Sequence, residues 1–108
     1  MSNYTSRFNK ETAQGGHNNT VLSQKVLPEG VQAPFGDAWG YLEGKSMMEV
    51  HSHPTEEIYM VFSGKGICHV GDERFEAVPG DVIRIPANVM HTMECGEGES
   101  ILWAALWW

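Results

Sequence analysis

Two histidines and a glutamate stand close together in one short segment, as His51, His53 and Glu57. Residues two apart in an extended strand point to the same face, with their Cα atoms about 6–7 Å apart, so both imidazoles can reach one point. Pro54 ends this strand and Thr55 begins a turn, which lets Glu57 return its carboxylate to the same place. Imidazole and carboxylate together suit a divalent transition metal, and the residue types leave Mn, Fe, Ni, Co, Cu and Zn open.

A third imidazole, His91, follows much later in the chain, after a turn, a short strand, a second turn and the start of a new strand. On that strand His91 shares a face with Met93 and Cys95. Cys95 is therefore expected near the metal, although its thiol is not assigned as a ligand. His91 is the natural third imidazole for the same ion.

The spacing of these residues resembles the first motif of the cupin superfamily. That motif runs Gly, five or more residues, His-x-His, three or four residues, Glu, six residues, Gly. The matching positions here are Gly44, His51, His53, Glu57 and Gly64. A lone His-x-His pair is weak evidence, whereas the pair together with a glutamate and a glycine at these offsets is specific.

The second cupin motif is matched in part. It runs Gly, five residues, Pro-x-Gly, two residues, His, three residues, Asn, and Pro86, Asn88 and His91 hold the corresponding spacings. Asn88 replaces the usual glycine, and Cys95 replaces the usual asparagine. The resemblance covers roughly residues 36–106 and implies a small single-domain cupin of the cupin 2 conserved-barrel type. It also implies one divalent transition metal per chain, held by His51, His53, Glu57 and His91.

The elements that must position these residues read as short strands. Apolar and β-branched runs are separated at close spacing by Gly, Pro, Asp and Asn turn signals, which is typical of a sandwich or barrel. The expected strands are 21–27, 38–42, 47–51, 57–63, 67–70, 75–78, 82–85, 90–95 and 101–107. No window shows a helical stripe with caps, so the prediction is all-β. By resemblance, the fold is a cupin jelly-roll β-barrel, also called a double-stranded β-helix.

We expect one domain, with residues 1–20 as a polar N-terminal arm and residues 21–108 as the cupin barrel. The arm is either loose or lies along a partner subunit. In the strand 57–62 both alternating faces are largely apolar, whereas a wall with one solvated face alternates more cleanly. Both faces are therefore expected to be covered, the inner by the barrel and the outer by other strands or by a second subunit, and a homodimer is favoured.

Six further side chains are candidates to line the cavity: Tyr59, Met93, Cys95, Arg84, Trp39 and Tyr41. For all but Arg84, packing in the core is the stronger interpretation. Arg84 would anchor a substrate carboxylate if it faced inward, and a surface or dimer ion pair is the alternative. His17 is interpreted as solvated, His69 as a residue of the barrel wall, and Glu56 as a surface acid or one that supports the site.

Composition limits the partners. The formal charge is −7, from 14 acidic against 7 basic residues, and such a field repels a polyanion, so nucleic acid is not expected. No run of about 18 uncharged apolar residues is present, so no membrane span is expected. The first 20 residues lack the apolar core of a secretory signal, and a cytoplasmic location follows as the default. Cys68 and Cys95 are interpreted as reduced, buried thiols.

Four protein ligands on an octahedral ion leave about two positions for water, dioxygen or a bidentate oxygen substrate. One hypothesis is therefore a metal-dependent enzyme of dioxygenase, decarboxylase or isomerase type, acting on a small oxygen-rich or carboxylate compound. The alternative is a non-catalytic cupin that binds or senses a small molecule. Fold alone does not choose between these classes, and no catalytic residue is assigned from the sequence.

Overall fold

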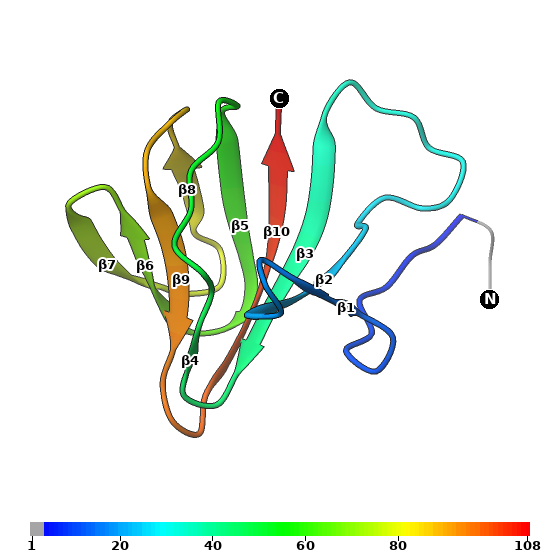
Figure 1. Cartoon of the computed structure of the whole chain (residues 1–108). Coiled ribbons are helices and arrows are strands. Elements are labelled where there is room, and N and C mark those ends of the chain that lie inside the picture. Colours follow the sequence, from blue (N-terminus) through cyan, green and yellow to red (C-terminus); the bar gives the residue numbers. More distant parts are fainter. Residues whose placement is uncertain (1–3) are drawn as a thin grey trace.

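The computed structural model describes residues 4–108, which form two antiparallel β-sheets and contain no helix (Figure 1). A six-stranded sheet has the order β1-β2-β3-β10-β5-β8, and a four-stranded sheet has the order β4-β9-β6-β7. The strands are β1 Gln14–Gly16, β2 Val21–Gln24, β3 Gly36–Glu43, β4 Ser46–Met47, β5 Glu57–Gly64, β6 Gly66–Val70, β7 Glu73–Ala77, β8 Val82–Ile85, β9 His91–Cys95 and β10 Ser100–Trp107. The all-β prediction is confirmed.

The last strand holds the larger sheet together. β10 lies between β3 and β5, so it pairs along most of its length with segments more than 35 residues earlier in the chain. In the smaller sheet β9 lies between β4 and β6, again joining segments distant in sequence. These long-range pairings bring the segment before β5 next to the start of β9, which is where the histidines of the two motifs lie.

The core lies between the facing sheets and is built from alternate residues of each strand. Trp103 of β10 is its largest fully buried side chain, and Ile85 and Met93 are likewise fully buried. A Cβ atom added at Gly40 of β3 would lie 2.4 Å from the Trp103 ring, so only glycine admits the indole at this point. The barrel interior is therefore closed by aromatic packing on the β3 side.

Two expected strands are shorter in the structure, because local side chains take their backbone amides. The strand expected at 47–51 is reduced to β4, since the Glu49 amide donates to Thr20 Oγ1 (2.7 Å) and leaves the ladder. His51 still pairs with His91 as an isolated bridge. The strand expected at 21–27 ends at Gln24, because the backbone amides of Val26 and Leu27 donate to Asp37 Oδ1.

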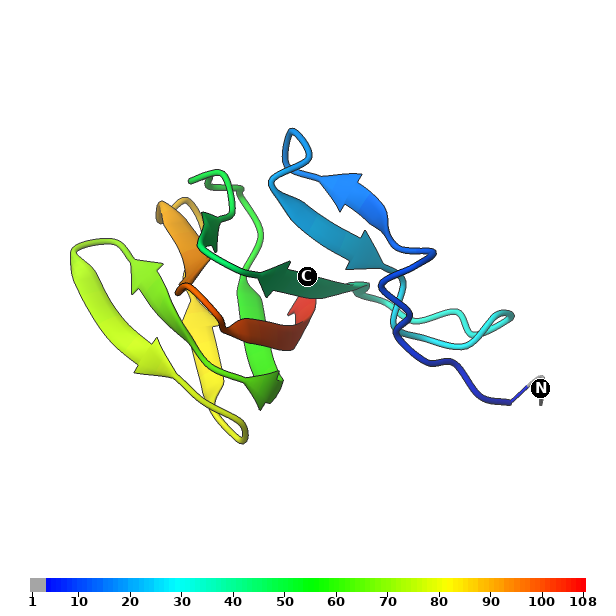
Figure 2. The ribbon, with the colours of Figure 1, turned by 90° about the horizontal axis from the view of Figure 1, so that it is seen from below.

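The first part of the chain folds onto the larger sheet. Residues 14–16 form β1, which pairs with β2 at the end of the six-stranded sheet to make a hairpin in front of β3 and β10 (Figure 1), and Figure 2 shows this hairpin above β3 in that view. Phe8 packs on the outer side of the sheet, with its ring centroid 5.4 Å from that of Tyr41 and 6.3 Å from that of Trp39. Residues 1–3 of the expected arm lie outside the described residues.

The outer face of the six-stranded sheet is apolar, as the pattern of 57–62 indicated. Along β5 the residues at 57, 59 and 61 are buried, and those at 58, 60 and 62 face outward. Phe62 is 55 % exposed and Val82 of the neighbouring β8 is 65 % exposed. Across residues 4–108, no helix has the length and apolar character needed to cross a membrane.

Candidate metal centre

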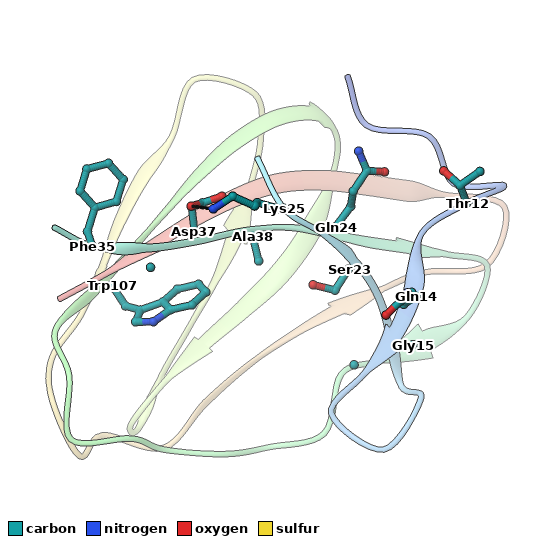
Figure 3. Close-up of a pocket in the computed structure, with 12 residues that line it drawn as sticks. Thr12, Gln14, Gly15, Ser23, Gln24, Lys25, Phe35, Asp37, Ala38 and Trp107 are labelled. Carbon is teal, nitrogen blue, oxygen red and sulfur yellow. Dashed lines mark hydrogen bonds and ion pairs between the residues drawn. The ribbon is translucent and has the colours of Figure 1, made fainter. Parts of the chain in front are cut away.

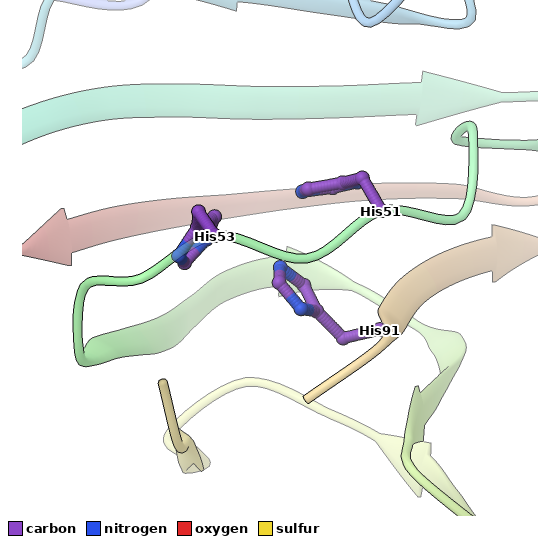
Figure 4. Close-up of side chains that lie close together, drawn as sticks. All are labelled: His51, His53 and His91. Atoms are coloured by element: carbon purple, nitrogen blue, oxygen red, sulfur yellow. The ribbon is translucent and has the colours of Figure 1, made fainter. Parts of the chain in front are cut away.

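Three histidines from two distant segments meet at one end of the barrel. His51 and His53 lie on the segment between β4 and β5, and His91 opens β9 (Figure 4). One nitrogen from each ring lies within 4.8 Å of the others, a separation that allows all three to hold the same metal ion. The His91 ring centroid is 4.3 Å from that of His51 and 4.9 Å from that of His53.

The backbone fixes the orientation of each ring. Every Nδ1 lies within hydrogen-bond distance of a carbonyl oxygen two residues away: Glu49 for His51 (2.7 Å), Thr55 for His53 (3.1 Å) and Val89 for His91 (2.8 Å). A carbonyl oxygen can only accept, so Nδ1 of His51 and of His91 carries the proton and Nε2 keeps its lone pair. The ring of His53 has a second choice, because Thr55 Oγ1 lies 2.9 Å from its Nδ1 and Glu57 Oε1 lies 2.9 Å from its Nε2, so either nitrogen can donate. The second nitrogen of a metal-binding histidine is held in the same manner.

The carboxylate of Glu57 lies among these lone pairs. Its Oε1 is 2.9 Å from His53 Nε2 and 3.2 Å from His91 Nε2, and Glu57 is only 6 % exposed. The carboxylate and the Nε2 atom of His91 are therefore acceptors that lie close together, whereas Nε2 of His53 is within hydrogen-bond distance of Glu57 Oε1. Acceptors gathered in this way repel unless a cation or a proton lies between them.

His91 Nε2 shows this need most directly. The nitrogen is fully buried and, within the part of the chain that the structure describes, it has no hydrogen-bond partner, because its approach to Glu57 lacks hydrogen-bond geometry. A buried polar atom left without a partner is costly, and native structures rarely keep one without a functional reason. The donor set and this orphaned nitrogen together fit a divalent metal ion.

Burial also favours the form of histidine that binds metal. Loss of solvent lowers the pKa of His51, against the opposing effect of its hydrogen bond to the Glu49 carbonyl. A lowered pKa keeps this imidazole neutral to a lower pH, and only neutral imidazole binds a metal. Burial likewise raises the pKa of Tyr59 well above its ordinary value, so the phenol below the histidines stays protonated.

A fourth histidine, His17, lies against the site. Its ring stacks on the His51 ring with a centroid separation of 3.8 Å and an interplanar angle of 22°. His17 remains exposed on its other side, so the interpretation as solvated covers only part of its environment. The low apolar content of the arm gave no signal of this contact, although Gly15-Gly16 followed by Asn18-Asn19 is the sequence of a turn.

The turn that carries His17 is held in an unusual conformation. His17, Asn18 and Asn19 have φ angles of 47°, 60° and 62°, in the left-handed region that side-chain-bearing residues seldom adopt. The Asn18 side chain donates to the Glu49 carboxylate, and Thr20 Oγ1 accepts from the Glu49 amide. Such strain persists where surrounding contacts determine the geometry, and here they hold His17 over His51.

Two pockets adjoin the histidines. The metal pocket has a volume of about 340 Å³ and is lined by His17, His51, His53, Thr55, Glu57 and Trp107. The inner pocket, of about 180 Å³, extends into the barrel, with Tyr59, Trp103 and Met48 among its lining residues. His17, Glu57 and Trp107 line both pockets, so these side chains form the wall that the two pockets share.

A larger groove lies away from the histidines. It has a volume of about 680 Å³, runs beside β1, β2 and the start of β3, and is lined by polar and apolar residues alike (Figure 3). Its lysine, Lys25, lies 3.4 Å from the Asp37 carboxylate. The groove meets the inner pocket at Trp107, whose ring lies so close to Gly36 that a Cβ there would be 2.0 Å from it.

The expected cavity residues divide into those that face inward and those that do not. Tyr59 lines the inner pocket, while Met93 and Cys95 are buried in the core and line neither described pocket. The Cys95 thiol donates to the Lys65 carbonyl oxygen at a distance of 4.0 Å. Cys95 was expected beside the histidines, but it lies at the opposite end of β9 from His91 and contacts other residues.

The other three candidates lie on the outer face of the larger sheet. Arg84 alternates with the buried residues of β8, so its side chain is 73 % exposed and pairs with Glu56 at 3.2 Å rather than facing the metal pocket. Trp39 and Tyr41 alternate with the inward Gly40 and pack against Phe8, although Trp39 also contributes to the inner-pocket wall. Arg84 therefore has the surface ion pair that was its alternative interpretation.

The remaining ionisable candidates have partners outside the site. His69 Nε2 lies 2.8 Å from Glu94 Oε2, and Arg74 lies 3.7 Å from the same carboxylate. Glu56 accepts from the Ala87 amide at 2.8 Å as well as from Arg84. The first two contacts join the strands β6, β7 and β9, and the Ala87 contact holds the loop after β8. They leave the histidine cluster with Glu57 as its neighbouring acid.

Comparison with known proteins agrees with this architecture. The cupin domain family model, Cupin_2, matches residues 39–108, more than half of the chain. A cupin 2 conserved barrel domain protein from Salinispora arenicola superimposes with a TM-score of 0.83 at 22 % identity, over 96 % of this chain and 87 % of that one. The predicted cupin jelly-roll fold is confirmed.

Two curated relatives match shorter parts of the chain. An uncharacterised protein of Methanocaldococcus jannaschii is 32 % identical over 66 residues, which are 61 % of this chain and 52 % of that protein. Acireductone dioxygenase 1 of Pectobacterium atrosepticum is 32 % identical over 57 residues, which are 49 % of this chain and 33 % of that enzyme. The matches thus span about half and about a third of the lengths of these relatives.

Proposed function

The chain belongs to the cupin 2 family, and from this premise we propose that it binds one divalent transition metal through His51, His53, Glu57 and His91. The observation that carries the proposal is the buried Nε2 of His91, which faces the other acceptors without a hydrogen-bond partner among residues 4–108. The oriented Nε2 atoms of His51 and His53 and the adjacent Glu57 carboxylate support it. Ions from Mn to Zn suit this donor set.

We further propose that the metal serves an enzyme that acts on a small oxygen-rich compound. A bound ion of this kind supplies Lewis acidity or redox chemistry to oxygen ligands at its open positions. The chain's own residues define the place of reaction, since His51, His53 and Glu57 line the metal pocket and the inner pocket shares part of its wall. The local likeness to an acireductone dioxygenase supports the dioxygenase type over decarboxylase or isomerase.

Metal binding can be tested on the whole chain by calorimetric titration of metal-free protein with Mn²⁺, Fe²⁺, Ni²⁺ and Zn²⁺. One ion per chain is expected, with affinity reduced by about 100-fold or more in His91→Ala. His69→Ala is the matched control, because His69 also pairs with a glutamate but lies outside the site. Wild-type protein that binds none of these ions, or equal losses in both variants, would refute the proposal.

Catalysis is tested separately from metal binding. Metal-loaded protein is incubated with a panel of enediols, hydroxy acids and keto acids, and oxygen uptake and product formation are followed. Turnover that disappears on metal removal and in His91→Ala supports an enzyme. Saturable binding of a panel member without turnover instead identifies a binding or sensing protein, and it would overturn the proposal of catalysis.

For the assembly, we propose a homodimer formed through the outer face of the six-stranded sheet. Phe62 and Val82 are both more than half exposed there, although each is apolar. A double substitution of these two residues to lysine is expected to give a monomer in light scattering, whereas Phe75→Lys, on the other sheet, leaves the dimer intact. A monomeric wild-type protein at high concentration contradicts this part of the proposal. The cytoplasmic location remains a prediction, which cell fractionation tests.

A further inference from the structure

The walls of the two pockets beside the histidines are aromatic and contain no formal positive charge. Tyr59, Trp103 and Trp107 line the inner pocket, together with aliphatic side chains. The centroid of the Tyr59 ring lies 5.5 Å from that of Trp103, so the two rings form one continuous surface. Among the described lining residues of both pockets there is neither lysine nor arginine, and Glu57 is the acid.

The nearby cations are held elsewhere. Arg84 pairs with Glu56 on the outside of the sheet, and Lys25 pairs with Asp37 in the groove beside β1 and β2. A carboxylate carried into the inner pocket would therefore lose water without gaining a cationic partner, and it would also approach Glu57. Burying an unpaired charge is unfavourable, so a ligand that reaches this pocket keeps its charge at the metal.

The inner pocket does offer a hydrogen-bond donor. Tyr59 is 2 % exposed, lies on the inward face of β5 and lines the pocket. No hydrogen bond to its hydroxyl is found among residues 4–108. A buried phenol with a free hydroxyl, next to aromatic rings, suits a neutral polar atom on an otherwise apolar ligand.

His17 and Trp107 line both the metal pocket and the inner pocket. A ligand that occupies both pockets therefore contacts these two rings. Trp107 is set by its close packing on Gly36, and His17 is set by the strained turn and its stack on His51. Flat rings in the wall of a pocket favour a flat ligand, because stacking gains contact at low entropic cost.

We propose that the ligand of this site is a planar aromatic or conjugated compound with two adjacent oxygens at the metal end and no other charge, and that His17 and Trp107 are specificity-determining residues that hold its ring. The proposal rests on the metal site proposed above. It excludes small dicarboxylates as the preferred ligands, because nothing described in the pockets can neutralise a second carboxylate.

The test compares two chelating probes on Ni²⁺-loaded protein, namely 2,3-dihydroxynaphthalene and oxalate. Both offer two oxygens to the ion, but only the first has a planar apolar body. We expect the naphthalene probe to bind at least about tenfold more tightly, which corresponds to about 1.4 kcal/mol. Binding is followed by titration calorimetry and by quenching of tryptophan fluorescence.

Variants locate the effect. His17→Ala and Trp107→Ala are each expected to weaken the naphthalene probe by about tenfold, with Ni²⁺ affinity and oxalate binding unchanged. His69→Ala and Trp108→Ala are the matched controls, since these residues line neither described pocket. The inference fails if oxalate binds as tightly as the naphthalene probe, or if the His17 and Trp107 variants bind that probe like the wild type. If the chain binds no Ni²⁺, the proposed function itself fails.

Discussion

Replacing Glu57 with glutamine should raise the stability of the metal-free protein while it lowers the affinity for metal. In the wild type, the carboxylate oxygen lies 3.2 Å from the unpartnered Nε2 of His91 and 2.9 Å from Nε2 of His53. An amide keeps the shape of the side chain but supplies an N–H that can donate to one of these nitrogens. A buried acceptor without a partner costs about 1–3 kcal/mol of folding free energy. Giving it a partner should therefore stabilise the protein by about 1 kcal/mol, the low end of that range.

For a domain of this size, about 1 kcal/mol corresponds to a rise in Tm of about 4 °C or more. The rise is measured by differential scanning calorimetry of the metal-free protein near pH 8. In the same variant, metal affinity should fall by about 100-fold, or about 2.7 kcal/mol, because a neutral amide replaces an anionic ligand. The variant should thus have a higher Tm without metal and a lower metal affinity. A general loss of folding would lower both.

Glu94→Gln is the matched control for this experiment. Glu94 also pairs with a histidine, His69, at 2.8 Å, but it lies on the outer side of β9 and is about a third exposed. Its replacement should leave metal affinity unchanged and Tm the same or slightly lower. A metal-free Glu57→Gln protein that melts below the wild type, with unchanged metal affinity, would refute the description of the site as a cluster of facing acceptors.

Three further outcomes test the account of the core. Cys68 is fully buried, and burial raises the pKa of its thiol to about 12, so iodoacetamide should label it only after unfolding, as mass spectrometry would show. Burial raises the pKa of Tyr59 above that of tyrosine in the unfolded chain, so its contribution to the free energy of unfolding is complete below about pH 10. Above that pH the Tyr59 phenol ionises in the unfolded chain and not in the folded one, so stability falls. Tyr59→Phe should lessen this fall in denaturant titrations. Gly40→Val places a side chain 2.4 Å from the Trp103 ring and should cost about 1–3 kcal/mol of unfolding free energy, with an unchanged midpoint contradicting the packing described.

The fold and the histidine cluster were predictable because their signals are local. Short apolar runs between turn residues indicated an all-β chain, and the spacing of His51, His53 and Glu57 indicated one shared point in space. The direction of Arg84 was also accessible, since it alternates with the isoleucines of β8 that are buried. An arginine close to a cavity in sequence does not by itself indicate that its side chain faces the cavity; the alternation of buried and exposed residues along the strand gives its direction.

Other features depend on contacts that no local pattern encodes. Glu49 leaves the strand ladder because its amide donates to Thr20, a residue of a different hairpin. His17 reaches His51 through the same hairpin, and its position follows from the pairing of β1 with β2 rather than from its neighbours in sequence. Polar segments give little warning of such contacts, because their hydrogen bonds are chosen by tertiary structure.

X-ray absorption spectroscopy of the Zn²⁺-loaded chain would show directly whether the three histidines and Glu57 hold the ion. The account predicts one ion per chain, with three imidazole nitrogens and a carboxylate oxygen at about 2.0–2.2 Å. His91→Ala should lose one imidazole from this spectrum. Sulfur scattering at about 2.3 Å would instead assign the ion to Cys68 or Cys95, and it would contradict the histidine site.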